Sequence, residues 1–209
     1  ASARETAIRV AAGSVFKQYL SALGVEIGGY VKEVCGVKDE GRYAFSELSR
    51  AKESGLGMLD AAAEKEAEEK VASLKTAGDT AGGVAEIRVK GPKSGFGSCM
   101  TYAEKLDARL AAGLMSIQAV KGVEVGAGFA SGGLSGREVH DEIFYENGFR
   151  RATNRAGGIE GGMSNGEEIV LRAAMKPIPT LMRGLGTAGY LTHERATAAS
   201  ERRDVCALF

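Results

Sequence analysis

The sequence is poor in several residues and patterns that mark specialised proteins. Its 209 residues include three prolines, two histidines and no tryptophan, and they contain no long uncharged apolar run. The missing apolar run argues against a membrane-spanning segment, and no signal-peptide pattern opens the chain. Lys and Arg total 27, as do Asp and Glu. A formal net charge of zero disfavours a general nucleic-acid binder, because such proteins are basic.

Cysteine is also scarce, at Cys35, Cys99 and Cys206. An odd number of cysteines with no CxxC spacing argues against a disulfide scaffold and against a zinc site. His140 and His193 have no metal-ligand spacing either, so we expect both at the surface and no metal. We expect a reducing, cytoplasmic compartment.

Glycine is abundant, at 30 of 209 residues. Many glycines beside few prolines indicate tight turns and loops whose backbone a ligand can approach closely. The chain otherwise alternates predicted helices and strands. We expect helices over Ser2–Leu23, Ala61–Ala77 and about Tyr102–Ala119, and strands over Val25–Val34, Val84–Lys90, Val120–Phe129 and Ile169–Met175.

Three patterns support these predictions. Ile8, Ala12, Val15, Tyr19 and Leu23 form the apolar stripe of the first helix, which Gly24 ends. Asp60 and Gly78 cap the second helix, whose many charges indicate a solvated face. Alternation over residues 84–90 indicates a sheet with one wet face, and Asn147–Gly148 predicts a hairpin with a type I′ turn within residues 143–152.

A weak internal echo relates two parts of the chain. Gly24–Gly28 reads GVEIG after one predicted helix, and Gly122–Gly126 reads GVEVG after another. Both copies predict a helix, a tight turn and a strand. A predicted strand, 84–90, also precedes the second copy, so this weak repeat favours a missing portion before Ala1.

The strongest local anomaly is the glycine-rich stretch from Asn154 to Gly166. Paired glycines let successive backbone N–H groups converge on an anion or a flat ring. A flexible surface loop accounts for the same composition, and the pattern alone does not decide between the two. No Gly-Lys-Ser/Thr follows, so this is not a nucleotide-binding P-loop.

Two further segments have candidate chemistry. In Lys176–Thr180, two prolines stiffen a strand end that carries a cation and a hydroxyl, which suits phosphate or a ring carbonyl, or simply ends an edge strand. In Arg202–Asp204, an acid beside two guanidinium groups suits anchoring or proton abstraction. A surface ion cluster is the plainer interpretation of that run.

Taken together, five blocks of the sequence resemble chorismate synthase. They occur in the family's order and span nearly the whole chain, and residues 37–80 resemble the family least. The matching blocks are Ala1–Thr6 with Arg9–Gly13, Ile117–Gly126, Thr153–Gly166, Ala174–Thr180, and Arg202 with Asp204–Ala207.

The resemblance implies an α+β fold, with helices sandwiched between antiparallel sheets and an internal pseudo-repeat, assembled as a homotetramer. It implies a carbon–oxygen lyase of the shikimate pathway, which makes precursors of the aromatic amino acids. The enzyme converts enolpyruvylshikimate phosphate to chorismate by losing phosphate and a ring proton from opposite faces. It requires reduced FMN without net redox change, supplied by a flavin reductase or by NADPH.

The resemblance also implies roles for individual residues. Asp204 matches the family's proposed proton acceptor, while Arg4 and Arg202 would hold the anionic substrate. The implied flavin contacts are Ala1, Ser2, Gln118, Ala119, Gly161, Lys176, Pro177, Ile178, Pro179, Thr180 and Arg202.

The sequence departs from the family in several respects. The family continues beyond Cys206–Ala207 into another helix, and Arg203 is bulkier and more charged than the residue expected there. The family's two working histidines and several phosphate-gripping arginines belong to motifs that residues 1–209 do not contain. We therefore expect a single domain over 1–209, truncated at both ends relative to the family and inactive by itself. The alternative is a non-catalytic flavin-binding, anion-binding or assembly module on the same scaffold.

Overall fold

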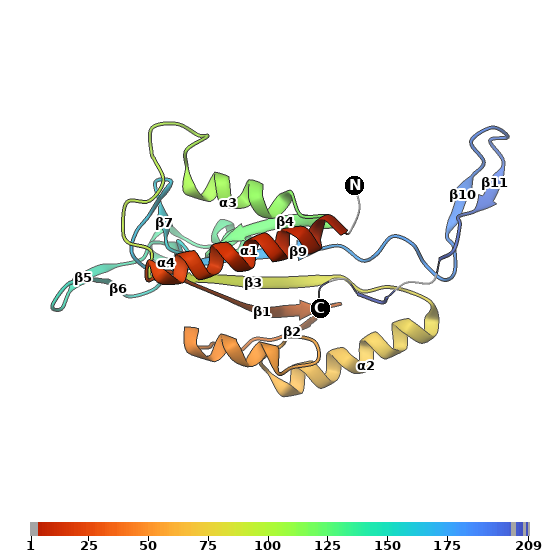
Figure 1. Ribbon diagram of the computed structural model, residues 1–209, viewed down its shortest axis with the longest axis horizontal. Helices are drawn as coiled ribbons and strands as arrows, with labels where there is room; N and C mark the ends of the chain where they lie inside the picture. The colour runs from red at the N-terminus through yellow and green to blue at the C-terminus, as the bar shows by residue number, and fades with distance from the viewer. Residues whose placement is uncertain (1–3, 202–203, 207, 209) are drawn as a thin grey trace.

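A five-stranded antiparallel sheet forms the centre of the structure (Figure 1). The computed structural model describes residues 4–201, 204–206 and 208. The strands lie in the order β2-β1-β3-β9-β4. Their bounds are Glu26–Val34 for β1, Val37–Lys38 for β2, Gly83–Lys90 for β3, Val120–Val125 for β4 and Ile169–Met175 for β9.

One face of the sheet is apolar and carries helix α3, Leu106–Met115. The alternating side chains of β9 confirm its predicted pattern, since Ile169 and Leu171 are buried against the helix. The helix contacts this face through Leu106, Leu110 and Leu114. It is shorter than the predicted 102–119, because the chain leaves the helix after Met115 to enter β4.

The opposite face of the sheet is polar but partly covered. Tyr30, Glu86, Arg172 and Glu124 lie in one row across four strands. The predicted wet face is therefore wrong for Glu86, which is 7% exposed. Its carboxylate accepts a hydrogen bond from Arg172 Nε at 2.9 Å, and this pairing is what makes burial of the charge tolerable. The 3₁₀ helix η1, Phe45–Lys52, packs against β1 on the same side of the molecule.

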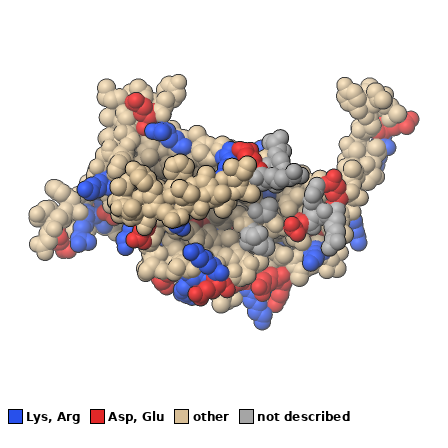
Figure 2. Space-filling view, viewed as in Figure 1, with Lys and Arg blue, Asp and Glu red and all other residues tan. Residues whose placement is uncertain are grey.

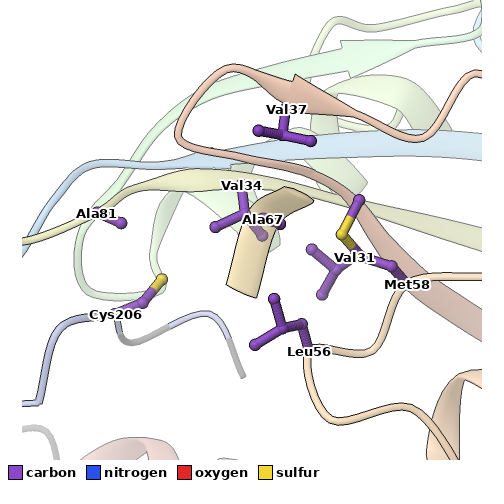
Figure 3. Close-up of a cluster of buried hydrophobic side chains, with 8 residues drawn as sticks. All are labelled: Val31, Val34, Val37, Leu56, Met58, Ala67, Ala81 and Cys206. Carbon is purple, nitrogen blue, oxygen red and sulfur yellow. The ribbon is translucent and has the colours of Figure 1, made fainter. Parts of the chain in front are cut away.

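Helix α2, Ala61–Ala77, was predicted with its caps, and the structure confirms both. The Asp60 carboxylate accepts hydrogen bonds from the N–H groups of Ala62 and Ala63, and Gly78 has the left-handed φ of +75°. The helix buries Ala67 in a core cluster that includes Val34 and Met58 (Figure 3). Charged side chains gather over its outer face, as predicted (Figure 2).

The topology contains the internal repeat that the sequence echo suggested. β1 follows α1, Arg4–Ala22, and β4 follows α3, and each of these strands pairs with one of the two inner strands. The residue alignment of the echo is wrong, however. Gly24 turns at φ +78° before β1, whereas the turn before β4 is at Ala119, with φ +68°, and Gly122 lies within the strand.

Two features near this repeat differ from the predictions, the end of β4 and the packing of α1. β4 ends at Val125 rather than at 129, because Gly126 takes a left-handed φ of +59° and η2 follows over Gly128–Gly133. The predicted stripe of α1 does not pack on the sheet, since Ile8, Val15 and Tyr19 are all more than 60% exposed. An apolar helix of this kind is normally buried.

Short elements complete the described chain and extend from the ends of the sheet (Figure 1). The predicted hairpin forms, but Tyr145 pairs directly with Phe149, so its loop has three residues and the type I′ turn is wrong. The short elements are α4, Gly136–Val139; β5, Ile143–Tyr145; β6, Phe149–Arg151; β7, Ile159–Glu160; β8, Met163–Ser164; β10, Gly186–Ala188; and β11, Arg195–Thr197.

Four smaller findings concern the cysteines, the histidines, the helices and the acidic residues. Cys35, Cys99 and Cys206 are free thiols that are half-buried, exposed and buried, respectively. His140 and His193 are exposed, as predicted. Among the described residues, no helix has the length and apolarity needed to cross a membrane, and no cluster of acidic, cysteine and histidine side chains suits a metal ion.

Candidate functional site

Two predicted segments meet where β4 begins and β9 ends. The backbone N–H of Lys176 donates to the carbonyl of Ala119 at 2.9 Å. Gln118, Ala119 and Lys176 therefore lie at the same end of the sheet, although almost sixty residues separate them in sequence. The structure thus brings together two of the blocks predicted to contact a flavin.

The backbone at this end of the sheet departs from regular geometry. Ala119 is left-handed, with φ +68°, a conformation that costs an L-residue about 1–2 kcal/mol. The pairing of β4 with β9 also shifts register between Val120 and Gly122, which marks a β-bulge at Lys121. Strained residues and bulges are common beside ligand sites, where they direct side chains or backbone groups.

The segment Pro177–Thr180 leaves the sheet as a stiff extension of β9. Neither Pro177 nor Pro179 has a backbone N–H, so neither can donate to a neighbouring strand. The hydroxyl of Thr80 donates to the carbonyl of Ile178 at 2.8 Å. This contact holds the extension against the residues that follow α2.

A cleft of about 560 Å³ opens beside this extension and contains two of the predicted residues, Thr180 and Asp204. Among the described residues that line it, Asp79, Glu201 and Asp204 are carboxylates, and Lys75 is a cation. An excess of carboxylates makes this end of the site better suited to accept a proton than to hold a phosphate. A bound anion is better placed near Lys176.

The glycine-rich stretch forms the small hairpin of β7 and β8 rather than a loose loop. Most of its glycines have a packing reason. A Cβ at Gly158 would lie 2.6 Å from the Glu168 carbonyl oxygen, and one at Gly162 would lie 2.8 Å from the Ser98 carbonyl oxygen. These contacts explain the glycines without a ligand.

Gly166 and Gly161 are the two open glycines of this stretch, and Gly161 is the one with a predicted ligand contact. Its φ is +59°, and a Cβ built there would have no atom within 4 Å. The residue is exposed at the turn between β7 and β8. Its backbone is therefore open to solvent, and its contact with a flavin stays a prediction.

Gly161 does not lie beside the other predicted residues. The carbonyl of Gly162 accepts a hydrogen bond from the N–H of Leu106, at the first residue of α3. Gln118 follows the other end of that helix, and ten helical residues span about 15 Å. Gly161 and Gln118 therefore lie about the length of α3 apart, and only an elongated ligand lying along α3 would contact both.

The two glycines offer a matched prediction for stability. Gly158→Ala places a Cβ against backbone and is expected to lower the free energy of unfolding by about 2–4 kcal/mol. Gly161→Ala adds only the left-handed strain of about 1 kcal/mol. Urea denaturation of both variants measures the difference. Equal losses would contradict the proposed distinction between packed and open glycines.

An anchor precedes this stretch. The buried Asp141 carboxylate accepts hydrogen bonds from the Thr153 hydroxyl and from the backbone N–H groups of Arg155 and Ala156. Burial by itself would raise the pKa of Asp141, but these hydrogen bonds outweigh it and hold the pKa below its ordinary value. The ionised carboxylate thus fixes the start of the glycine-rich stretch.

Several predicted residues lie outside the described part of the chain. These are Ala1, Ser2 and Arg202, together with the side chain of Arg4. The nearest described link to the first block is Arg9, whose Nη1 donates to the Ser116 hydroxyl at 2.7 Å. The early turns of α1 therefore approach the residues just before Gln118.

The structure adds residues that the sequence did not single out. Thr80 contacts the predicted flavin segment, and Lys75 and Asp79 line the cleft with Asp204. They follow or belong to α2, in the part of the chain with the least resemblance to the family. Their spacing contains no signal that would have identified them.

A second cleft, of about 1000 Å³, opens on the polar face of the sheet. Arg172 lies on its floor, with Nε 2.9 Å from Glu86 and Nη1 3.7 Å from Glu124. The cleft contains none of the predicted flavin or substrate residues. Arg172 is already paired with these two carboxylates, and the predicted residues lie elsewhere, so the first cleft remains the better candidate site.

Comparison with known proteins gives one consistent family. The family model described as chorismate synthase matches residues 1–209. The chain is 50% identical over 218 residues to the chorismate synthase of Geobacter metallireducens, covering 99% of this chain and 56% of that protein. It is 50% identical over 210 residues to the Thermus thermophilus chorismate synthase, covering 100% of this chain and 55% of that protein.

A solved structure agrees with these sequence matches. The structure, titled as a crystal structure of chorismate synthase, superposes with a TM-score of 0.80 at 38% identity. The match covers 84% of this chain and 56% of that chain. The present chain therefore spans about half the length of the relatives it matches.

Proposed function

Because the chain belongs to the chorismate synthase family, we propose that it contributes flavin-binding and proton-accepting residues to an FMN-dependent lyase. The reaction eliminates phosphate from 5-enolpyruvylshikimate 3-phosphate and yields chorismate. The observation that carries this proposal is the meeting of residues 118–119 and 176–180 at one end of the sheet. Asp204 lines a cleft beside them.

The described residues fit a flavin in two respects. Lys176 places a cation at the stiff end of β9, which suits an anionic reduced ring or its phosphate. Gly161 presents backbone with no side chain in the way, and an elongated flavin lying along α3 would contact both Gly161 and the end of the sheet that carries Lys176. By the family resemblance, Ala1, Ser2, Gln118, Ala119, Thr180 and Arg202 would complete the contacts.

The reaction gives separate tasks to two charged residues: Lys176 would hold the anionic flavin, and Asp204 would accept the proton. The C–O bond to phosphate breaks with its electron pair leaving on phosphate, and a C–H bond breaks on the opposite face of the ring. The electron pair of the C–H bond forms the new double bond, and the proton passes to the carboxylate of Asp204. Reduced FMN, when bound, lends electron density transiently, so the reaction has no net redox change.

The proposal extends to assembly and to the supply of reduced flavin. The family resemblance suggests a homotetramer in the cytoplasm, with a flavin reductase or NADPH as the source of electrons. The exposed apolar side chains of α1 support association with further protein surface, because such patches are costly to leave in water. Arg4 and Arg202 would help to hold the anionic substrate.

The decisive experiment is an anaerobic titration of the 209-residue chain with reduced FMN. We expect saturable binding, and Lys176→Gln should weaken it about tenfold, because a charge-assisted contact is lost. Lys65→Gln, on the exposed side of α2, is the matched control and should bind like the parent chain. No saturable binding by the parent chain would overturn the proposal.

An activity assay separates the enzyme from the non-catalytic alternative. The chain by itself is expected not to turn over substrate, because the family's histidine motifs are not among residues 1–209. Turnover at ordinary enzyme rates would refute that expectation. Flavin binding without any activity, even when the remainder of a family chain is supplied, would instead support a binding module.

A further inference from the structure

Three successive residues after α2 contact both candidate segments. The Thr80 hydroxyl donates to the Ile178 carbonyl at 2.8 Å, and the Ala81 N–H donates to the Val205 carbonyl at 2.8 Å. Gly82 lies so close to the end of β9 that a Cβ there would be 2.5 Å from the Met175 carbonyl oxygen. We call residues 80–82 the clasp.

The Thr80 contact matters because its partner segment, residues 177–180, has few other groups that can form hydrogen bonds. Pro177 and Pro179 remove the backbone donors on either side of Ile178. Among the described residues, residues 177–180 make one hydrogen bond, the one that the Ile178 carbonyl accepts from Thr80. Thr80 is itself buried, at 9% exposed, so its hydroxyl has little access to water.

The other side of the clasp is fixed by the core. Cys206 follows Val205 and is 6% exposed, and it packs in the cluster that contains Ala81 and Val34 (Figure 3). The segment that carries Asp204 is therefore attached to the same three residues as the end of β9. Movement of the clasp would change the separation between Asp204 and Thr180.

We propose that the clasp sets the geometry of the flavin site and that Thr80 is a positioning residue for segment 176–180. This inference rests on the proposed function and adds a residue outside the matching blocks. Thr80 acts through the Ile178 carbonyl and contacts no flavin itself. The segment that contains α2 therefore contributes to the site, because it positions residues 80–82 there.

The test compares Thr80→Val, which removes the hydroxyl at nearly constant volume, with Thr80→Ser, which keeps it. Thr76→Val is the matched control, because the Thr76 hydroxyl bonds to the Ala72 carbonyl within α2 and lies outside the clasp. Each 209-residue variant is titrated with reduced FMN under anaerobic conditions. Thr80→Ala repeats the measurement if Thr80→Val does not fold.

We expect Thr80→Val to weaken FMN binding about five- to tenfold, the effect of one lost hydrogen bond. Thr80→Ser should bind within about twofold of the parent, and Thr76→Val should be unchanged. In the flavin-free chain, amide hydrogen exchange over residues 178–182 should accelerate in Thr80→Val but not in Thr80→Ser. This second measurement does not depend on flavin or activity.

Three results would overturn the inference, and they are distinguishable. If the parent chain binds FMN and Thr80→Val binds equally well, the positioning role is wrong while the proposed function stands. The same holds if Thr80→Ser loses as much affinity as Thr80→Val, because the hydroxyl is then not what matters. If the parent chain does not bind FMN at all, the proposed function and this role both fail.

Discussion

Asp204→Asn is expected to lower turnover by about 10²–10⁴-fold, the usual contribution of a general base. The amide has nearly the shape of the carboxylate but cannot accept the ring proton. Asp204 is exposed and lines the cleft beside Thr180, so the substitution leaves no buried charge unpaired. Affinity for reduced FMN should therefore stay within about twofold, which separates loss of chemistry from loss of the site.

The measurement needs a protein that turns over substrate. Residues 1–209 can replace the matching segment of the Thermus thermophilus relative, which aligns with the whole chain at 50% identity. Glu146→Gln, at the exposed tip between β5 and β6, removes a negative charge far from the cleft and serves as the control. A graft that stays fully active as Asp204→Asn would show that Asp204 is not the proton acceptor.

Asp39→Asn is expected to lower the free energy of unfolding by about 3 kcal/mol. Asp39 is completely buried. Its Oδ1 accepts from the Gly41 N–H and the Tyr43 hydroxyl, and its Oδ2 accepts from the N–H groups of Leu59 and Asp60. An amide replaces one acceptor oxygen with a donor, which faces donors already in place.

Urea denaturation checks this expectation, with the exposed neighbour Glu40 as control. Glu40→Gln should change stability by less than about 0.5 kcal/mol. A loss as small for Asp39→Asn would show that the loop between β2 and α2 does not depend on this carboxylate. The same loop leads into α2 and so to the clasp.

The stabilisation by Asp39 should depend on pH in a defined direction. Burial by itself would raise the pKa of Asp39, but hydrogen bonds from Tyr43, Gly41, Leu59 and Asp60 outweigh it and hold the pKa below its ordinary value. The unfolded chain therefore binds the proton more readily. The contribution is complete above the unfolded pKa of about 3.9 and is lost as pH falls through the lower folded pKa.

The gap between the parent chain and Asp39→Asn should accordingly narrow as pH falls below about 4. A gap that stays constant from pH 7 down to pH 3 would mean that the ionised carboxylate is not the stabilising form. Chemical denaturation at each pH gives both curves.

Features that depend on near neighbours could be read from the sequence. The ends of α2 follow from the side-chain cap at Asp60 and the left-handed glycine at 78. The burial pattern of β9 follows from the alternation of its apolar residues. The open backbone at Gly161 follows from the position of that glycine in a glycine-rich stretch. Each of these depends on hydrogen bonds or φ preferences within a few residues, which the local sequence contains.

Other features required the folded chain. The early end of α3, the bulge before Gly122 and the exposure of α1 depend on which strands meet and what covers them. Gly161 lies apart from Lys176 because the length of α3 separates the β7–β8 turn from the turn at Ala119. Thr80 bonds to Ile178 across 98 residues because β3 and β9 are neighbours in the sheet, and no local pattern encodes that pairing. The residue types identified the candidate groups, and the order of the strands in the sheet determined which of them lie together.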